Sequence, residues 1–483
     1  MGHDFPFVWF IVAFVVYTAL LFFISYLTGK NAGSKSFFGG ERKAPWPVVA
    51  YGMVGASISG VTFISVPGNV WVQNFFYMPL VFGFVVGYII IAKVLLPLYY
   101  KMNLTSIYTY LGERFGEKTY KTGTAVFMVS RFLGAAVRMF VVIVVFFSFL
   151  PKSMQQGGVC TFAVISLIFL VLLYLYTYKG GVKTIIWTDA LQTTFMLLAV
   201  GLTIYYICKD MNLGFKGMVE TVASSSYVSM FDWDWSHGTN AVKQFISGIF
   251  VTIAMTGLDQ SMMQKNLACK DLKSAQKNMY TTSIIIVAVN FFFLLLGALL
   301  CVFVSNHGGL DAMGIVKTDE IFPTIASRYF GVGLGIFFLI GLISASYPSA
   351  GAALTSLTTS FCVDYLHDIE EGRRKRVQAV MAAIFFVILV VLYMFSNDAV
   401  VNLVYKLASY TYGPLLGFFF FGLLTKRRIK DHAAPYIAVG APLMCLLINL
   451  ALRSFCGFDL GFSLLILNGA LSFAGLWAMS KRI

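Results

Sequence analysis

The segment AYGMVGASISGVTF, residues 50–63, places three glycines and two serines inside one apolar stretch. The stretch is long enough to cross a bilayer, and we expect a membrane-spanning helix over residues 46–66 that these small residues interrupt. Backbone that is not helical is tolerated at membrane depth only where it lines a polar cavity, because lipid offers no hydrogen-bond partner. The segment therefore predicts a broken helix beside a polar site, with tight helix packing through glycine and serine as the alternative.

A second interrupted stretch lies in the span predicted over residues 240–262, which contains Gly248, Thr252, Thr256 and Gly257. The two interrupted spans stand five spans apart, and an odd offset gives them opposite orientations in the membrane. Interrupted helices at matching places in two inverted halves indicate a transporter site near the middle of the bilayer.

The composition of the whole chain requires a membrane environment. Of the 483 residues, 59% are hydrophobic and only 12% are charged, whereas soluble domains carry about 25% charged residues. Apolar stretches of spanning length recur along the chain. We therefore predict an all-α protein with thirteen transmembrane helices. The predicted spans cover residues 7–28, 46–66, 76–98, 119–150, 158–178, 184–208, 240–262, 280–304, 329–362, 377–396, 399–425, 432–452 and 459–479.

The basic residues between these spans predict the orientation in the membrane. Alternate loops hold 24 Lys and Arg on one side and seven on the other. Because cytoplasmic loops carry the excess of positive charge, we expect the N-terminus outside and the C-terminus inside an inner (plasma) membrane. This distribution also accounts for the net charge of +14, so the charge does not indicate a nucleic-acid partner.

The ninth span, residues 329–362, contains a second kind of irregularity. Pro348 cannot donate a backbone hydrogen bond and frees the carbonyl of Ser344. The oxygen atoms of Ser344, Ala345 and Ser349 then lie in one neighbourhood. Hard cations such as Na⁺ prefer oxygen ligands. The span therefore suggests a cation site, with a simple proline kink as the alternative.

Five motifs follow one another along the chain. They are SISGVTFISVPG at residues 57–68, LTSIYTYLGERF at 104–115, GGVKTIIWTDALQ at 180–192, Asp259-Gln260 with Gln264-Lys265, and GPLLG at 413–417 before Thr425-Lys-Arg427. In this order they resemble the motifs of the sodium:solute symporter family, and among its branches they look closest to the bacterial sugar and sialic-acid carriers. The resemblance covers nearly the whole chain.

The resemblance implies a fold of five-plus-five inverted repeats, of the LeuT-like kind, within a single transmembrane domain. On this chain the first repeat corresponds to residues 46–210 and the inverted second repeat to residues 240–425. One extra helix (1–45) precedes the repeats, and two C-terminal helices (426–483) follow them.

The resemblance also implies a sodium site. Its ligands fall on the backbone of Gly55 and Ile58, in the first broken helix, and on Ala345 and Ser349 in the ninth span. The family usually has two adjacent hydroxyl residues where this chain has Pro348-Ser349, so one hydroxyl ligand is missing. Two further serines that hold a second sodium ion in the sialic-acid branch are Gly and Ala at 351–352, and we expect no second ion. In that branch, Asp189 corresponds to the carboxylate that binds the second ion. Here we expect Asp189 to lie on the ion path or to have a structural role.

Ionisable residues inside the predicted spans are costly and are therefore candidates for function. Arg131 and Arg138 stand seven residues apart on one helical face, and Lys406 is a third cation at membrane depth. Asp189 and Asp259 are the acids within the spans. An excess of positive charge suits an anionic solute, because a guanidinium binds a carboxylate with two hydrogen bonds.

One alternative and three expectations accompany this hypothesis. The arginines could instead pair with the two aspartates or with carbonyls at helix ends. For Asp259, we expect a structural pair with Lys265. Phe250 aligns with an aromatic residue that lines the family's cavity, and the hydroxyls of the first broken helix are expected to contact the solute. These hydroxyl residues are Ser57, Ser59 and Thr62.

The sequence thus predicts a sodium-coupled symporter that imports a small polar solute, most readily a carboxylate such as sialic acid, a related sugar acid or a monocarboxylate. Residues suited to hydrolysis or phosphate binding are absent, so an enzyme is not expected. We expect the functional unit to be a monomer in the lipid bilayer. The alternatives are a neutral-sugar or proton-coupled symporter of the same fold, or a solute sensor that does not transport.

Overall fold

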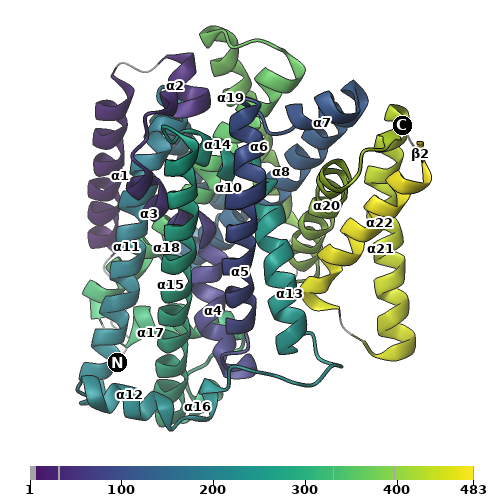
Figure 1. The fold of residues 1–483 in the computed structure, drawn as a ribbon. Coiled ribbons are helices and arrows are strands. Elements are labelled where there is room, and N and C mark those ends of the chain that lie inside the picture. Colours follow the sequence, from purple (N-terminus) through teal and green to yellow (C-terminus); the bar gives the residue numbers. More distant parts are fainter. Residues whose placement is uncertain are drawn as a thin grey trace.

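The computed structural model describes residues 7–30, 33–148, 150–329, 331–395, 398–458 and 460–481, with the side chains of α20 from Tyr410 onward. The described chain folds as a bundle of long helices (Figure 1). The helices that overlap the predicted spans are α1 (Phe7–Gly29), α3 (Trp46–Ser57), α4 (Gly60–Gln73), α5 (Met78–Ile90), α6 (Leu96–Lys101), α8 (Glu117–Ser148), α10 (Gly158–Thr177), α11 (Val182–Asp210), α13 (Ala241–Thr252), α14 (Gln260–Leu267), α15 (Leu272–Asn306), α18 (Gly331–Ser360), α19 (Glu371–Met394), α20 (Asp398–Leu424), α21 (Ala434–Cys456) and α22 (Leu464–Ala478).

Shorter elements occupy the connections, and the sequence analysis did not predict them. They are α2 (Ser34–Gly39), α7 (Thr109–Phe115), α9 (Lys152–Gln155), α12 (Phe215–Ala223), α16 (Gly309–Ala312), α17 (Ile321–Arg328) and the paired strands β1 (Arg428–Ile429) and β2 (Ser480–Lys481).

The membrane-spanning character of the chain agrees with the prediction. Ten of the described helices are long and apolar enough to cross a bilayer, and two bent helix pairs pass the same test together. These elements correspond to twelve of the predicted spans. The remaining span corresponds to α20, whose side chains are described only over Tyr410–Leu424. The count of thirteen therefore stays a prediction.

Both interrupted spans are broken as the sequence predicts. The first bends by 62° between α3 and α4, and the second bends by 67° between residues 257 and 260. The second break lies at Leu258–Asp259, after a π-helical turn over Ile253–Gly257. Asp259 caps α14 there by accepting hydrogen bonds from the amides of Ser261 and Met262. A side-chain cap of this kind stabilises a helix start inside the membrane.

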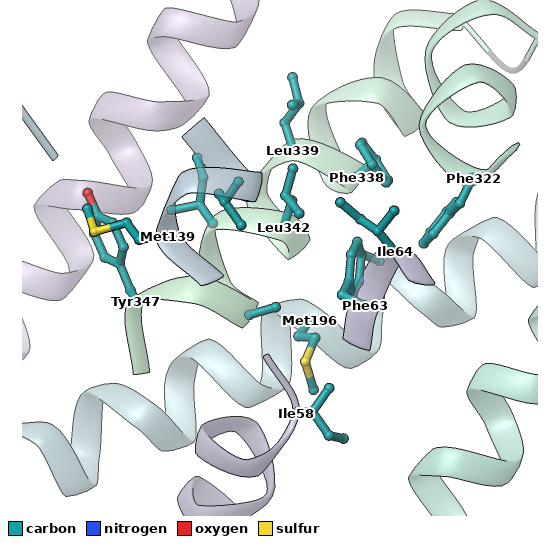
Figure 2. Packing of buried hydrophobic residues seen from close by; sticks show 14 of the residues in the cluster. Ile58, Phe63, Ile64, Met139, Met196, Phe322, Phe338, Leu339, Leu342 and Tyr347 are labelled. Atoms are coloured by element: carbon teal, nitrogen blue, oxygen red, sulfur yellow. The ribbon is translucent and has the colours of Figure 1, made fainter. Parts of the chain in front are cut away.

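A large apolar core surrounds the first break (Figure 2). Phe63, at the start of α4, packs against Phe322 and Phe338 with ring centroids 5.2 and 5.7 Å apart. Ile58, in the break itself, lies beside Met196 of α11 in this core (Figure 2). The position of the broken segment is therefore fixed by dense packing on one side, and its polar groups face the other side.

The helices α20, α21 and α22 stand together at one flank of the bundle, and α1 lies at the opposite flank (Figure 1). Within this flank, Asn468 of α22 donates a hydrogen bond to the carbonyl of Tyr410 in α20. Gly413 of α20 lies so close to Asn468 that a Cβ atom there would be 2.2 Å from its Cγ. The C-terminal helices therefore form one packed unit with α20.

Candidate functional site

The first broken helix brings a helix end, a helix start and hydroxyl groups to one point. Ile58 is extended (φ −88°, ψ 106°), so α3 ends at Ser57 and α4 begins at Gly60. The last carbonyl oxygens of a helix cannot accept a hydrogen bond from a following helical amide. The Ser59 side chain caps α4 by accepting from the amide of Thr62 at 3.3 Å. Ser57 donates to the carbonyl of Met53 at 2.8 Å.

An inner cavity of about 160 Å³ adjoins this break. It is bounded by the break, by α5, by α8 and by the second interrupted span. The polar residues predicted for the solute, Ser57, Ser59 and Thr62, all line it. The second span and α15 add further polar residues, which are Thr252, Thr256 and Asn290.

An outer cavity of about 430 Å³ continues from the inner one. Five residues line both cavities, namely Arg131, Arg138, Val251, Met255 and Phe462. The C-terminal helices also line the outer cavity, a contribution that the sequence analysis did not predict. Polar side chains of the outer cavity belong to Gln73, Ser130, Thr239, Gln244, Tyr410, Tyr412, Asn449 and Arg453.

The charge of the two cavities is positive. Three arginines, Arg131, Arg138 and Arg453, are among the lining residues, and the described lining includes no Asp or Glu. A low-dielectric cavity with this charge attracts anions. The side chain of Lys406, the third cation predicted at membrane depth, lies outside the described residues.

Arg131 is buried and carries its own counter-ion. Its Nη1 lies 3.6 Å from Oδ2 of Asp259, and the Tyr412 hydroxyl donates to the same oxygen at 2.7 Å. Its Nη2 donates to the carbonyl of Ser349 at 3.3 Å. Within the described part of the chain, its Nε has no hydrogen-bond partner. The pairing of an arginine with an aspartate, which the sequence left open, is thus observed for Arg131.

The prediction that Asp259 pairs with Lys265 is wrong. Lys265 instead forms a buried ion pair with Asp189, and the two side chains are 3% and 2% exposed. The physical reason lies in the break, because Asp259 points back to cap α14 and towards α8, whereas Lys265 lies one to two turns further along α14 and reaches α11. Asp189 therefore has a structural partner in this conformation.

Arg138 differs from Arg131 in its partners. Its Nη1 donates to Oγ of Ser349 at 3.2 Å. Among the ion pairs of the described residues, none involves Arg138. The side chain is partly exposed and lines both cavities. Arg138 is therefore a cation at membrane depth that hydrogen-bonds a serine and faces the cavity.

The predicted sodium ligands come from two neighbouring helices. Gly55 packs so closely on α11 that a Cβ atom would be 2.2 Å from Oγ1 of Thr193. Ala345 and Ser349 are buried in α18. The hydroxyl of Ser344, which the sequence grouped with them, donates to Tyr17 of α1 instead, at 2.8 Å. Carbonyl and hydroxyl oxygens suit Na⁺, but Arg138 uses the Ser349 hydroxyl in this conformation.

The predicted place of Phe250 in the cavity is not observed. Phe250 is absent from the described lining of both cavities, and its ring packs on Phe420 with centroids 5.9 Å apart. The next residue, Val251, lines both cavities. One residue turns a helix by about 100°, so an offset of one residue moves a side chain from the cavity wall to a neighbouring face of the helix.

Polar contacts that the sequence analysis missed join the loop after α6 to the second break. Gln260, beside the second break, accepts from the amide of Ile107 at 2.9 Å and donates to the carbonyl of Thr105 at 2.7 Å. Tyr108 donates to the carbonyl of Leu258 at 2.9 Å. The sequence signal for these contacts was the family-like motif at residues 104–115. Its residues hold their own loop against the second break.

A second group of contacts lies at the same end. Asp364, at the end of the ninth span, accepts hydrogen bonds from Ser106 at 2.8 Å and from Thr124 at 3.0 Å. Tyr120 donates to its other oxygen at 2.8 Å. Three elements are thereby joined at the side opposite the outer cavity.

At the outer side, Asp232 fixes the loop that borders the cavity. Its carboxylate accepts from Thr239 at 2.6 Å and from the amide of Asp234 at 3.0 Å, and Nδ1 of His237 lies 2.9 Å away. Burial raises the pKa of Asp232, but these hydrogen bonds outweigh burial and hold the pKa below its usual value. The stabilisation is therefore present above the usual pKa of an aspartate and is lost as the pH falls through the lowered value.

Comparisons with known sequences identify the family. The model of the sodium:solute symporter family matches residues 37–434. The sodium/sialic acid symporter SiaT of Proteus mirabilis is 22% identical over 460 residues, which cover 90% of this chain and 88% of that protein. Sodium-coupled monocarboxylate transporter 1 of Homo sapiens is 22% identical over 430 residues, which cover 85% of this chain and 67% of that protein.

Solved structures with the same fold include the substrate-bound, outward-open state of a Na⁺-coupled sialic acid symporter. It matches with a TM-score of 0.81 at 17% identity and covers 98% of this chain and 99% of its own. MHP1, a transporter of the nucleobase-cation-symport-1 family, matches with a TM-score of 0.59 at 13% identity and covers 93% and 95% of the two chains. These matches confirm the fold class predicted from the sequence.

Proposed function

Because the chain belongs to the sodium:solute symporter family, we propose that it imports a small carboxylate-bearing solute together with Na⁺. The observation that carries this proposal is the charge of the cavities, whose described lining holds three arginines and no acidic residue. Transport is secondary active, and the inward gradient of Na⁺ supplies the free energy.

The solute's carboxylate binds between Arg138 and the hydroxyl groups of the first break. A guanidinium contacts a carboxylate through two parallel hydrogen bonds, which fixes the orientation of the anion. Arg138 lacks an acidic partner among the described ion pairs and faces both cavities. Nε of Arg131, which has no described partner, supplies a further donor. Ser57, Ser59 and Thr62 are placed to bind the polar remainder of the solute.

Sodium binds between the first break and α18. Its proposed ligands are the carbonyls of Gly55 and Ile58, with Ala345 and Ser349 opposite them. The same broken segment thus holds the ion through its backbone and the solute through its hydroxyls. Coupling requires that each ligand binds better when the other is present, and a shared segment provides this link.

The solute class follows from the cavity and from the relatives. Among similar proteins, the symporter SiaT is described as a carrier of sialic acid, and the human relative as a carrier of monocarboxylates. A sialic acid, a related sugar acid and a monocarboxylate share the carboxylate that Arg138 requires. We propose this shared group as the feature that is recognised.

The proposed topology follows from the loop charges. The outer cavity is bordered by Gly238, Thr239 and Gly461, which belong to loops poor in Lys and Arg that are expected outside. The cavities lie within one chain, which supports a monomer as the transporting unit. We propose an inner or plasma membrane location, with residues 46–210 and 240–425 as the two inverted repeats.

Uptake by proteoliposomes tests the proposal. Purified protein is given radiolabelled N-acetylneuraminate, glucuronate, lactate or glucose, with an inward gradient of either Na⁺ or choline. We expect concentrative uptake of at least one of the three acids with Na⁺ and only background uptake with choline. Uptake of an acid that is equally fast with choline, or concentrative uptake of glucose alone, would contradict the proposal.

A further inference from the structure

Ser349 lies at the meeting point of two guanidinium groups. Its carbonyl accepts from Nη2 of Arg131 at 3.3 Å, and its hydroxyl accepts from Nη1 of Arg138 at 3.2 Å. The residue is 1% exposed and follows Pro348 directly in α18. The one side-chain hydroxyl among the proposed sodium ligands therefore already carries a positively charged donor.

The two arginines are held to Ser349 with different strength. Arg131 is buried and tied to Asp259, which Tyr412 also contacts. Arg138 is partly exposed, and the described ion pairs include none with it. Its contacts can therefore change at small cost, whereas moving Arg131 would leave Asp259 as an unpaired buried charge.

Sodium and Arg138 exclude each other at Ser349. A cation ligated by the hydroxyl would lie next to Nη1 of Arg138, so the two positive charges would stand only a few ångströms apart in a poorly screened site. Binding of the ion therefore requires that the guanidinium moves away. Because Arg138 lines both cavities, its side chain can move into the space that they provide.

We propose that Arg138 is a tethered cation that occupies the sodium position at Ser349 until a carboxylate in the cavity draws it away. The inference rests on the proposed function and adds the means of coupling. The solute frees the Ser349 hydroxyl by binding Arg138, so it raises the affinity for Na⁺. By reciprocity, Na⁺ at Ser349 holds Arg138 in the cavity and raises the affinity for the solute.

Titration of the purified full-length protein with Na⁺ alone, without any solute, tests this proposal. The readout is the midpoint of thermal unfolding at constant ionic strength, with choline replacing Na⁺. We expect Arg138→Gln to lower the half-saturating Na⁺ concentration by at least about tenfold, because the competing charge is gone. Arg138→Lys keeps a tethered cation and should stay within about threefold of the wild type.

Two further variants make the result specific. The gain in Na⁺ affinity should disappear in Arg138→Gln combined with Ser349→Ala, because the ligand itself is then missing. Lys152→Gln, which removes an exposed charge in the connection after α8, should leave the titration unchanged. If Arg138→Gln does not fold, Arg138→Met carries the same expectation.

An unchanged half-saturating Na⁺ concentration in folded Arg138→Gln or Arg138→Met would overturn the inference, and so would a gain that survives Ser349→Ala. The outcome is separate from that of the proposed function. Sodium-dependent uptake by the wild type combined with an unchanged titration defeats only the competition. Uptake that ignores Na⁺, combined with a gain in Arg138→Gln, defeats only the proposed sodium coupling.

Discussion

At the scale of residues, the charges at membrane depth carry most of the account. The sequence singled out Arg131, Arg138 and Asp189 because charge inside a bilayer is costly. It could not predict which charges meet. Lys265 is near Asp259 in sequence, yet Asp259 caps α14 and contacts α8, whereas Lys265 reaches α11, so each finds a partner on another helix. Pairing is set by the directions of side chains after the 67° bend, which spacing alone does not encode.

The pair between Lys265 and Asp189 should contribute strongly to stability. Lys265→Met leaves a buried carboxylate without its counter-ion, and we expect a loss of about 3–5 kcal/mol in the free energy of unfolding. Denaturant unfolding in detergent measures this loss. As a control, Lys216→Met removes one partner of an exposed pair with Glu220, 3.7 Å apart, and should change stability little. Equal effects of both variants would refute the structural role.

Solute affinity should depend on the shape of the group at position 138 as well as on its charge. Arg138→Lys retains the positive charge but cannot make the two parallel hydrogen bonds of a guanidinium. We expect the KM for a carboxylate solute to rise about tenfold, which corresponds to one lost hydrogen bond. Initial rates of uptake at saturating Na⁺ give this KM. An unchanged KM would show that Arg138 does not bind the carboxylate.

At the scale of elements, the spans and the two broken helices could be predicted from composition and from small residues in apolar stretches. The exact break in the second span could not. Gly248, which the sequence emphasised, instead serves close packing, because a Cβ atom there would be 2.1 Å from the carbonyl oxygen of Leu80. The break follows the π-helical turn that ends at Gly257 and is fixed by the Asp259 cap. A glycine in a span thus indicates either a break or a close approach, and packing decides which.

The contact between α3 and α11 holds the first break in place. Gly55→Ala puts a methyl group within 2.2 Å of Oγ1 of Thr193, so either Thr193 must give up its hydrogen bonds to the carbonyls of Tyr51 and Asp189 or the helices must separate. We expect a marked loss of thermal stability and of Na⁺-dependent uptake. Gly201→Ala is the matched control, because a Cβ atom at Gly201 of α11 meets nothing within 4 Å. It should be neutral or slightly stabilising, since alanine is the better helix former. Similar stability of both variants would contradict the close packing.

The hydrogen bonds to Asp364 should keep closed the end of the inner cavity that the proposed topology places towards the cytoplasm. Asp364→Asn weakens three charge-assisted contacts from Ser106, Thr124 and Tyr120. We expect faster labelling of Thr256→Cys, in the inner cavity, by a thiol reagent supplied from the cytoplasmic side. The same Asp364 variant without Thr256→Cys controls for the seven native cysteines. Labelling at an unchanged rate would show that these contacts do not close the cavity.

At the scale of the whole molecule, the sequence predicts the family fold and a site between broken helices, and the structure adds the outer cavity. Its wall includes Asn449 and Arg453 of α21, together with Phe462 before α22. These residues lie far from both interrupted spans in sequence, and the segments that contain them carry none of the family-like motifs. Their contribution arises from the way α20–α22 pack at one flank of the bundle (Figure 1). Such packing between distant helices is what local patterns cannot predict.

The central claim is that the positively charged cavity takes up a carboxylate together with Na⁺. The most direct test compares uptake of one radiolabelled acid with uptake of its methyl ester, in proteoliposomes with an inward gradient of Na⁺ or choline. The ester differs from the acid by one methyl group, which removes the negative charge that Arg138 would bind. We predict concentrative uptake of the acid with Na⁺, and background uptake both of the ester and of the acid with choline. Equal uptake of acid and ester, or uptake of the acid without Na⁺, would contradict the account.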